Sequence, residues 1–328
     1  MPDPGVRRVG RRGFCVGLLL AAALPRARSE EVVAVGAQDL EWFDAARQRA
    51  VPVRLYRPSQ APPRPLPLVV FSHGIGGSRA GYGYLGRHWA ARGVASLHLQ
   101  HVGSDRQLWL GNPLELIGRL QGAAQEAEAI ARARDLRFAL DRVLAGDAGI
   151  PVDATRIVAA GHSYGANTTL LVCGARVQRA AMPDDLHDPR VRGAIVISAP
   201  PFYGETDLPA ILGNVQVPSL HVTTTDDVIR IPGYYSGPDD RLRVFEATGG
   251  AQKWLAVFAG GSHALFTGRR GDTSPVLQAT RELAHAFVRR VLSGDERALA
   301  EWPRQHAPLI ERFVGPGSPV PQRPLTTA

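Results

Sequence analysis

The sequence predicts an α/β protein in which a mostly parallel central sheet is flanked by helices, with loop insertions at the carboxyl ends of the strands. Three observations lead to this fold class. Apolar runs of strand length alternate with segments of helical periodicity along the 328-residue chain. A Gly-x-Ser-x-Gly pentapeptide, residues 161–165, joins one such run to one such segment. Asp226, Asp227 and His263 each come directly after or close behind a later strand-like run.

The predicted sheet begins before this pentapeptide. Residues 31–58 contain opening strands, of which 51–56 is the clearest, and a proline-rich connection over 60–67 leads to the apolar run 66–72. The glycine-rich segment 73–77 follows that run. We therefore expect a strand that ends in a loop with unusual backbone freedom.

A helix and a sharp turn come next. The helix is predicted over about 123–145, and its apolar positions fall near helical spacing at Ile130, Ala133, Leu136, Ala139, Leu140 and Val143. The run 156–160 then leads through the pentapeptide into a helical segment, 166–173. This context is typical of a nucleophile elbow, in which a serine is forced into strained angles and flanking glycines remove Cβ atoms that would collide. Ser163 is the predicted nucleophile.

A serine hydroxyl needs a general base, and His263 is the predicted one. It lies in a Gly-Gly-Ser-His-Ala segment after the strand-like run 253–258 and before a helical pattern over 275–291. Of the ten histidines, only this one combines a glycine-rich loop with a place late in the chain. We expect His162, inside the pentapeptide, to point away from the serine.

The base needs an orienting carboxylate, for which the chain offers two neighbours. The run 218–225 is rich in β-forming residues and ends in Asp226-Asp227. We predict Asp226 as the acid because it is the first residue past the run, and Asp227 stays open as the alternative.

An oxyanion hole is the third expected component, since acyl transfer places negative charge on a carbonyl oxygen. One predicted donor is the backbone N–H of Tyr164, the residue after the nucleophile. The second is the N–H of Ile75 in the glycine-rich loop, with Gly74 as the alternative. We interpret His73 as an anchor of this loop that takes no part in chemistry.

Three segments exceed a minimal core, namely 103–121, 200–215 and 229–250. Each leaves the carboxyl end of a predicted strand, which is where α/β sheets bind their ligands. Their large apolar and aromatic residues are candidates to line a pocket for an acyl or leaving group: Trp109, Leu110, Leu114, Phe202, Tyr203, Tyr234 and Tyr235.

With these residues in view, the chain resembles serine hydrolases of the α/β-hydrolase fold. Within that fold it is most similar to plasma-type platelet-activating-factor acetylhydrolases and bacterial predicted dienelactone hydrolases. The resemblance rests on 51–58, 69–77, 91–94 with 97–105, and the pentapeptide, and spans roughly 38–292. It implies a Ser-His-Asp triad and cleavage of esters.

The chain departs from those relatives at two points. In the acetylhydrolases the acid leaves the strand after the elbow helix, but here the corresponding run, 194–200, carries no acid at its end. This departure favours the later acid, Asp226. Dienelactone hydrolases proper use a cysteine nucleophile, whereas this chain has Ser163.

The ends of the chain predict segments outside the domain. Residues 1–29 combine a basic start, the twin arginine Arg11-Arg12 and a short apolar run, which together indicate a twin-arginine export signal, with an ordinary secretory signal as the alternative. The apolar run is too short for a membrane span. We assign 30–314 to the α/β-hydrolase domain and 315–328, rich in Pro and Gly, to a flexible tail. The protein is therefore expected to be periplasmic or secreted.

Charge and composition exclude several other classes. The formal charge of the full chain is +8, but residues 1–29 hold six arginines and one aspartate, so the mature chain carries about +3. No basic run interleaved with aromatics indicates nucleic-acid binding. No metal-ligand spacing and no dinucleotide fingerprint appears, so we expect no cofactor. The expected partner is a small-molecule or lipid-like ester, and the sequence leaves the oligomeric state open.

Two functions remain after this reading. The first is an exported serine hydrolase that cleaves carboxylic esters. The alternative is an exported, non-catalytic binding protein that retains the hydrolase fold, which the complete set of Ser163, Asp226, His263, Tyr164 and Ile75 argues against.

Overall fold

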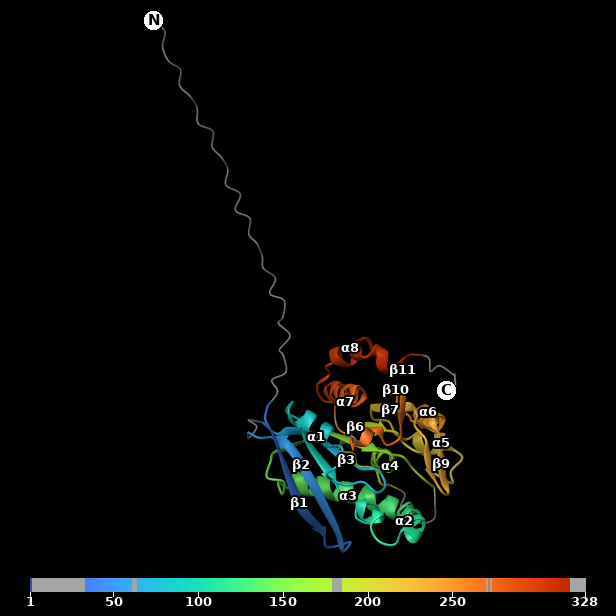
Figure 1. Ribbon diagram of the computed structural model, residues 1–328. Helices are drawn as coiled ribbons and strands as arrows, with labels where there is room; N and C mark the ends of the chain where they lie inside the picture. The colour runs from blue at the N-terminus through green and yellow to red at the C-terminus, as the bar shows by residue number, and fades with distance from the viewer. Residues whose placement is uncertain (2–32, 61–63, 179–184, 270, 272, 319–328) are drawn as a thin grey trace. The chain divides into compact units, whose positions relative to one another are not determined.

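The computed structural model describes Met1 and residues 33–60, 64–178, 185–269, 271 and 273–318 (Figure 1). The chain divides into Met1–Glu31 and Val32–Ala328, and every element named here belongs to the second unit. Apart from Met1, the predicted signal segment 1–29 lies outside the described residues. Of the predicted tail, only 315–318 is described.

A central sheet organises the described part of the chain. Its strand order is β1-β2-β4-β3-β5-β6-β7-β10-β11. The six central strands, β4, β3, β5, β6, β7 and β10, run parallel to one another. At the two edges, β2 pairs antiparallel with β4, β1 with β2, and β11 with β10. The strands are β1 (Val35–Asp44), β2 (Arg49–Pro58), β3 (Leu66–Ser72), β4 (Ala95–Leu99), β5 (Val152–His162), β6 (Val191–Ile197), β7 (Ser219–Asp226), β10 (Lys253–Ser262) and β11 (Ile310–Val314).

Helices cover both faces of this sheet (Figure 1). One core cluster joins the sheet to α3, α4, α5 and α6, and a second joins it to α1, α7 and α8. All seven residues of β3 are buried, because a parallel strand in the middle of a three-layer fold has no solvent face. The helices are α1 (Gly83–Ala90), α3 (Glu126–Leu144), α4 (Tyr164–Val172), α5 (Leu208–Leu212), α6 (Pro238–Ala247), α7 (Pro275–Ser293) and α8 (Arg297–Gln305).

The predicted α/β class with a mostly parallel, helix-flanked sheet is confirmed. The helix expected at about 123–145 is confirmed as α3, which begins at Glu126 after the extended residue Gln125, and a separate short helix, α2 (Leu116–Ala123), ends just before it. Both α8 and β11 lie past the last helix that the sequence pattern predicted.

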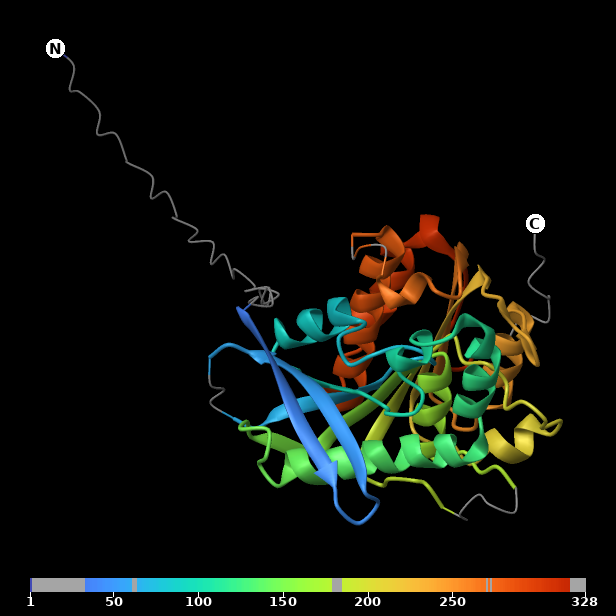
Figure 2. The same cartoon turned by 60° about the horizontal axis from the view of Figure 1, so that its bottom comes forward.

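The three expected insertions have short elements of their own. The first contains the 3-10 turns η1 (Arg106–Trp109) and η2 (Pro113–Glu115) and then α2. The second holds α5, and the third holds the hairpin β8 (Ile229–Ile231) and β9 (Tyr234–Ser236) followed by α6. Figure 2, turned by 60°, shows α3 running along one face of the sheet. Among the described helices, none is both long and apolar enough to cross a membrane.

Candidate active site

Ser163 occupies the sharp turn between β5 and α4. Its backbone angles are φ 56° and ψ −124°, in a region that side-chain-bearing residues rarely adopt. A Cβ on Gly161 would overlap the carbonyl group of Gly165, and one on Gly165 would overlap the carbonyl group of Ser72. The pentapeptide therefore needs glycine at both positions so that β3, β5 and α4 can approach one another closely.

The imidazole of His263 lies directly against this serine. His263 follows the end of β10, and its Nε2 is 2.8 Å from Ser163 Oγ. Its Nδ1 is 2.6 Å from Asp227 Oδ1. Because a carboxylate oxygen accepts, Nδ1–H donates to Asp227 and Nε2 is left to accept the serine proton. Three side chains from distant parts of the sequence thus form one hydrogen-bonded chain.

The carboxylate on this imidazole is Asp227, so the prediction that Asp226 makes this contact was wrong. β7 extends one residue past the predicted run, and Asp226 is its exposed last residue, paired with Ser262 of β10. The chain then bends, with the N–H of Val228 donating to the carbonyl of Asp226 at 2.9 Å. Successive strand residues point to opposite sides, and the bend brings the next residue, Asp227, inward.

Asp227 is fully buried, and its carboxylate accepts hydrogen bonds from three side chains. Besides His263, these are Thr223 Oγ1 at 2.7 Å and Arg241 Nη2 at 3.2 Å. Burial alone would raise the pKa of Asp227, but the hydrogen bond from His263 and the charges of His263 and Arg241 outweigh it and hold the pKa well below its usual value. Sequence reasoning missed Arg241, a buried residue of α6 within the third insertion.

His162 ties the base to the loop on the other side of the serine. Its Nε2–H donates to the carbonyl of His263 at 3.0 Å, and its Nδ1 accepts from the hydroxyl of Tyr82 at 2.8 Å. Burial lowers the pKa of His162 to about 3, which keeps the ring neutral and this tautomer fixed. The Tyr82 oxygen in turn accepts from the N–H of Gly74 at 3.4 Å.

The glycine-rich loop after β3 faces Ser163 as expected. A Cβ on Gly74 would lie 3.1 Å from the Cβ of Ser163, so this residue abuts the serine directly. The N–H of Gly74 is directed to Tyr82, whereas those of Ile75 and Tyr164 have no hydrogen-bond partner among the described residues. Both Ile75 and Tyr164 line the cavity that contains Ser163. This pair is therefore available to bind an anionic oxygen.

His73 anchors that loop without facing the cavity. Its Nε2 accepts from the N–H of His101 at 3.1 Å, so its Nδ1–H donates to the carbonyl of Gly74 at 2.7 Å. The side chain is buried, and burial lowers its pKa well below the usual value. This contact pattern is that of a structural histidine.

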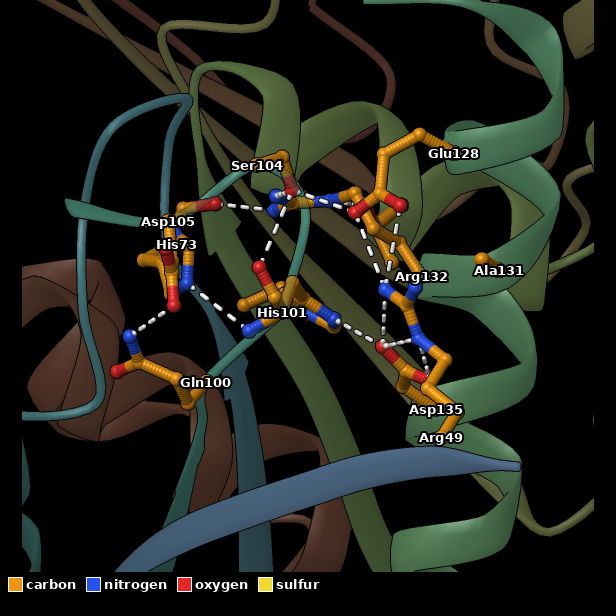
Figure 3. Close-up of polar contacts among 12 residues, drawn as sticks. Arg49, His73, Gln100, His101, Ser104, Asp105, Glu128, Ala131, Arg132 and Asp135 are labelled. Carbon is orange, nitrogen blue, oxygen red and sulfur yellow. Dashed lines mark hydrogen bonds and ion pairs between the residues drawn. The ribbon is translucent and has the colours of Figure 1, made fainter. Parts of the chain in front are cut away.

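Behind His73 lies a buried arginine that sequence reasoning missed (Figure 3). Arg132 of α3 is 0% exposed, and its guanidinium donates to the carbonyl of His73, to Ser104 Oγ at 2.8 Å and to Thr168 Oγ1 at 3.0 Å. Its charge also lies 4.5 Å from the ring centre of Tyr164. One side chain thus joins the oxyanion-side loop, the loop after β4 and the elbow helix.

Two carboxylates near Arg132 offset its positive charge (Figure 3). Ser104 Oγ donates to Glu128 at 2.7 Å, and Glu128 also accepts from Arg49. The fully buried Asp135 accepts from Arg49 and from His101 Nδ1. The available signal in the sequence was the charge pattern of α3, because residues 132 and 135 share the buried side of the helix with apolar residues.

A cavity of about 490 Å³ opens over Ser163 and His263. Most of its wall is apolar or aromatic, which suits an organic ligand. Four of the predicted pocket residues, Trp109, Phe202, Tyr203 and Tyr234, line it. The other three, Leu110, Leu114 and Tyr235, do not; they are exposed side chains on the insertions. Within the part of the chain that is described, no group of three or more His, Cys, Asp or Glu is placed to hold a metal ion.

Comparison with known proteins adds a family and a structural neighbour. A family model described as the alpha/beta hydrolase family matches residues 69–324. The sequence matches none of the curated proteins with which it was compared. Among solved structures, a ferulic acid esterase from Streptomyces cinnamoneus shares 24% identity and a TM-score of 0.56, covering 83% of this chain and 93% of that one. At this identity the likeness shows a common fold.

Proposed function

Because the chain belongs to the alpha/beta hydrolase family, we propose that it is an exported serine hydrolase that cleaves carboxylic esters through an acyl-enzyme. The observation that carries the proposal is the hydrogen-bonded chain from Ser163 through His263 to Asp227, with two unpaired backbone N–H groups beside it. The proposal includes export through the signal predicted in residues 1–29 and the resemblance to platelet-activating-factor acetylhydrolases.

In the proposed reaction, Ser163 Oγ attacks the ester carbonyl while its proton passes to His263 Nε2. The carbonyl oxygen, now negative, is bound by the N–H groups of Ile75 and Tyr164. The ester C–O bond then breaks, and the leaving alcohol takes the proton from His263. Water attacks the acyl-enzyme by the same steps in reverse order, which releases the acid and restores Ser163.

Asp227 has a fixed part in this scheme. Its carboxylate holds Nδ1–H of His263, which keeps Nε2 free as a base and stabilises the imidazolium formed during each proton transfer. The depressed pKa of Asp227 means that it stays ionised throughout the neutral range. Arg241 and Thr223 secure the carboxylate from behind.

The test compares wild type with Ser163→Ala on p-nitrophenyl acetate and butyrate. We expect kcat to fall by about 10⁴-fold or more, because the serine, base and acid act as a unit. A fluorophosphonate probe should label wild type and not the variant. Equal turnover in the two proteins would refute the proposal, and a wild type that is neither active nor labelled would favour a non-catalytic binding protein.

A substrate panel gives the proposal its scope. The mostly apolar cavity of about 490 Å³ favours short to medium acyl groups over long chains that would extend beyond it. Esters of aromatic acids belong in the panel because the structural neighbour is a ferulic acid esterase. Acetyl, butyryl and aromatic esters with a common leaving group, compared by kcat/KM, would rank the acyl groups.

A further inference from the structure

Ile75 lies between fixed neighbours in the oxyanion-side loop. The N–H of Gly76 donates to the carbonyl of Ser104 at 2.8 Å, and the carbonyl of Gly74 accepts from the N–H of Gly77 at 2.9 Å. The N–H of Ile75 has no hydrogen-bond partner among the described residues. An unpaired donor inside a fixed loop needs no rearrangement before it binds an anionic oxygen.

The side chain of Ile75 is held by the first insertion. It packs against a small apolar cluster whose buried members are Leu108, Leu120 and Ala123. Leu108 lies in η1, and the other two residues lie in α2. The insertion therefore contacts the side chain of this donor residue and, through Ser104, the backbone of the residue that follows it.

The carbonyl of Gly76 accepts hydrogen bonds from two side chains at the cavity. Trp109 Nε1–H donates to it at 2.8 Å and Arg269 Nη2–H at 3.3 Å. A carbonyl oxygen has two lone pairs, so one acceptor serves both donors. Trp109 belongs to η1 and Arg269 to the segment after His263, so two distant parts of the chain meet at one backbone atom. Both side chains line the cavity that contains Ser163.

Gly76 is the residue that allows Trp109 to come so close. Its φ is 68°, in the left-handed region that favours glycine, and a Cβ there would lie 2.5–2.6 Å from three atoms of the Trp109 indole. The ring therefore lies directly on the backbone of Gly76 while its N–H bonds to the carbonyl. Because Trp109 remains 48% exposed, packing in the core does not explain this placement.

The core does not explain the placement of Arg269 either. Its side chain is exposed, and within the described residues the hydrogen bond that its guanidinium makes goes to the carbonyl of Gly76. Other exposed arginines pair with carboxylates, as Arg243 does with Asp240. An exposed arginine bound to one backbone carbonyl of this loop indicates a role in the loop itself.

The other proposed oxyanion donor needs no such support. The N–H of Tyr164 belongs to the first residue of α4, so its direction follows from the strained turn at Ser163 and from the helix. Ile75 has neither a helix nor a strand of its own. Contacts from outside the loop are therefore needed to fix the direction of its N–H.

We propose that Trp109 and Arg269 are positioning residues for the oxyanion hole, acting through the carbonyl of Gly76 to fix the N–H of Ile75. This inference rests on the proposed esterase function. Loss of both donors releases the Gly76 carbonyl and lets the preceding N–H turn. Binding of an anionic oxygen is then weakened more than binding of a neutral ligand.

The test compares two inhibitors that share one side chain, phenethyl trifluoromethyl ketone and phenethyl methyl ketone. With the electrophilic trifluoromethyl ketone, Ser163 Oγ bonds to the carbonyl carbon and the serine proton passes to His263 Nε2. The carbonyl oxygen becomes an anion in the oxyanion hole. The methyl ketone is far less electrophilic and binds as the neutral ketone. The inhibition constant of the methyl ketone divided by that of the trifluoromethyl ketone therefore measures how well a protein stabilises the anion.

We expect this ratio to fall about threefold in Trp109→Phe and in Arg269→Met, because each change leaves the other donor in place. In the double variant it should fall about tenfold. Removal of an oxyanion donor itself costs about 10²–10³-fold, so loss of residues that only position the donor should cost less. A change in the shape of the cavity affects both inhibition constants and largely cancels in the ratio.

Two matched controls make the same chemical changes elsewhere. Trp302 Nε1–H donates to the carbonyl of Ala279 at 2.9 Å, and the guanidinium of Arg57 donates to the carbonyl of Pro58 at 3.3 Å. None of these four residues lines the cavity. Trp302→Phe and Arg57→Met should each keep the wild-type ratio, whatever stability they lose in urea unfolding.

The outcomes separate this inference from the proposed function. A double variant that folds, cleaves ester and keeps the wild-type ratio overturns the inference, as does an equal loss of affinity for both ketones. A comparable fall in the two controls overturns it too, because the effect is then general. A wild type that cleaves no ester and resists the fluorophosphonate probe fails at the earlier step. If the double variant does not fold, Arg269→Met carries the test at an exposed position, and an unchanged ratio there overturns the inference.

Discussion

The two sides of Ser163 are built by different means. On the base side, His263 is partly exposed, with 19% of its side chain accessible, and it contacts a single ionised carboxylate. On the oxyanion side, the loop at residues 73–77 is backed by neutral histidines and the fully buried Arg132. The base side must exchange protons with substrate and water, whereas the oxyanion side needs only fixed dipoles. The difference shows that accessibility in this site follows the task of each group.

The same comparison separates local from distributed support. Asp227 is held by two residues nearby in the chain, Thr223 and Arg241. Arg132 joins the oxyanion-side loop to α3, to the loop after β4 and to α4, and the loop after β4 also bonds to it directly through the N–H of His101 and Nε2 of His73. We therefore expect single substitutions on the base side to act on chemistry, and substitutions on the oxyanion side to act on chemistry and stability together.

The largest expected effect tests the base side. Asp227→Asn should lower kcat about 10⁴-fold, because an amide no longer fixes the productive tautomer of His263 or stabilises its charge. Asp226→Asn makes the same chemical change, a carboxylate to an amide, in the exposed neighbour, and its kcat should stay within about twofold of wild type. The measurement is kcat on p-nitrophenyl butyrate with both variants side by side. Equal losses, or a larger loss in Asp226→Asn, would contradict the hydrogen-bond assignment.

The next effect tests the oxyanion side. Arg132→Met removes the donor to the His73 carbonyl while keeping much of the stem, and we expect kcat to fall roughly tenfold, less than for a direct oxyanion donor. It should also lower the free energy of unfolding by about 3 kcal/mol, because buried partners are left unpaired. KM should change little, since Arg132 does not line the cavity.

Arg49→Met is the matched control for this prediction. Arg49 belongs to the same network through Asp135 and Glu128 but contacts neither the loop at residues 73–77 nor α4. It should lose stability, measured by urea unfolding, without the tenfold loss of kcat. If the two variants lose stability alike and both keep wild-type kcat, Arg132 supports the fold and does not position the oxyanion side.

The same contrast explains how far the sequence predicts this site. Gly161, Ser163 and Gly165 are predictable because the elbow is a local motif, and neighbouring residues in the sequence meet its steric requirements. The place of His263 follows from chain order and its loop. The choice between Asp226 and Asp227 was not predictable by pattern, because it depends on where β7 ends and on a bend of one residue.

The supporting network lies further from what a pattern can predict. Arg132 and Asp135 fall on the apolar side of α3, which the sequence shows, but the groups that they bind come from other elements and are known only from the tertiary contacts. Arg241 lies in an insertion that the sequence marked only as extra chain. The fold class and the chain order of the nucleophile, the acid and the base could thus be predicted. The residues that support these three side chains could not.

The smallest expected effect tests whether the two sides are coupled. The hydroxyl of Tyr82 links Gly74 of the oxyanion side to His162, which in turn holds the carbonyl of His263. Tyr82→Phe removes that link and leaves Nδ1 of His162 unpaired, so we expect kcat to fall about threefold to tenfold, equivalent to about 1 kcal/mol. Tyr84→Phe is the control, because its buried hydroxyl donates to the carbonyl of Phe266 and to no atom of Ser163, His263, Asp227 or the loop at residues 73–77. Similar losses of stability in the two variants, with a loss of kcat only in Tyr82→Phe, would show that the sides depend on each other; unchanged kcat in both would show that base and oxyanion loop are positioned independently.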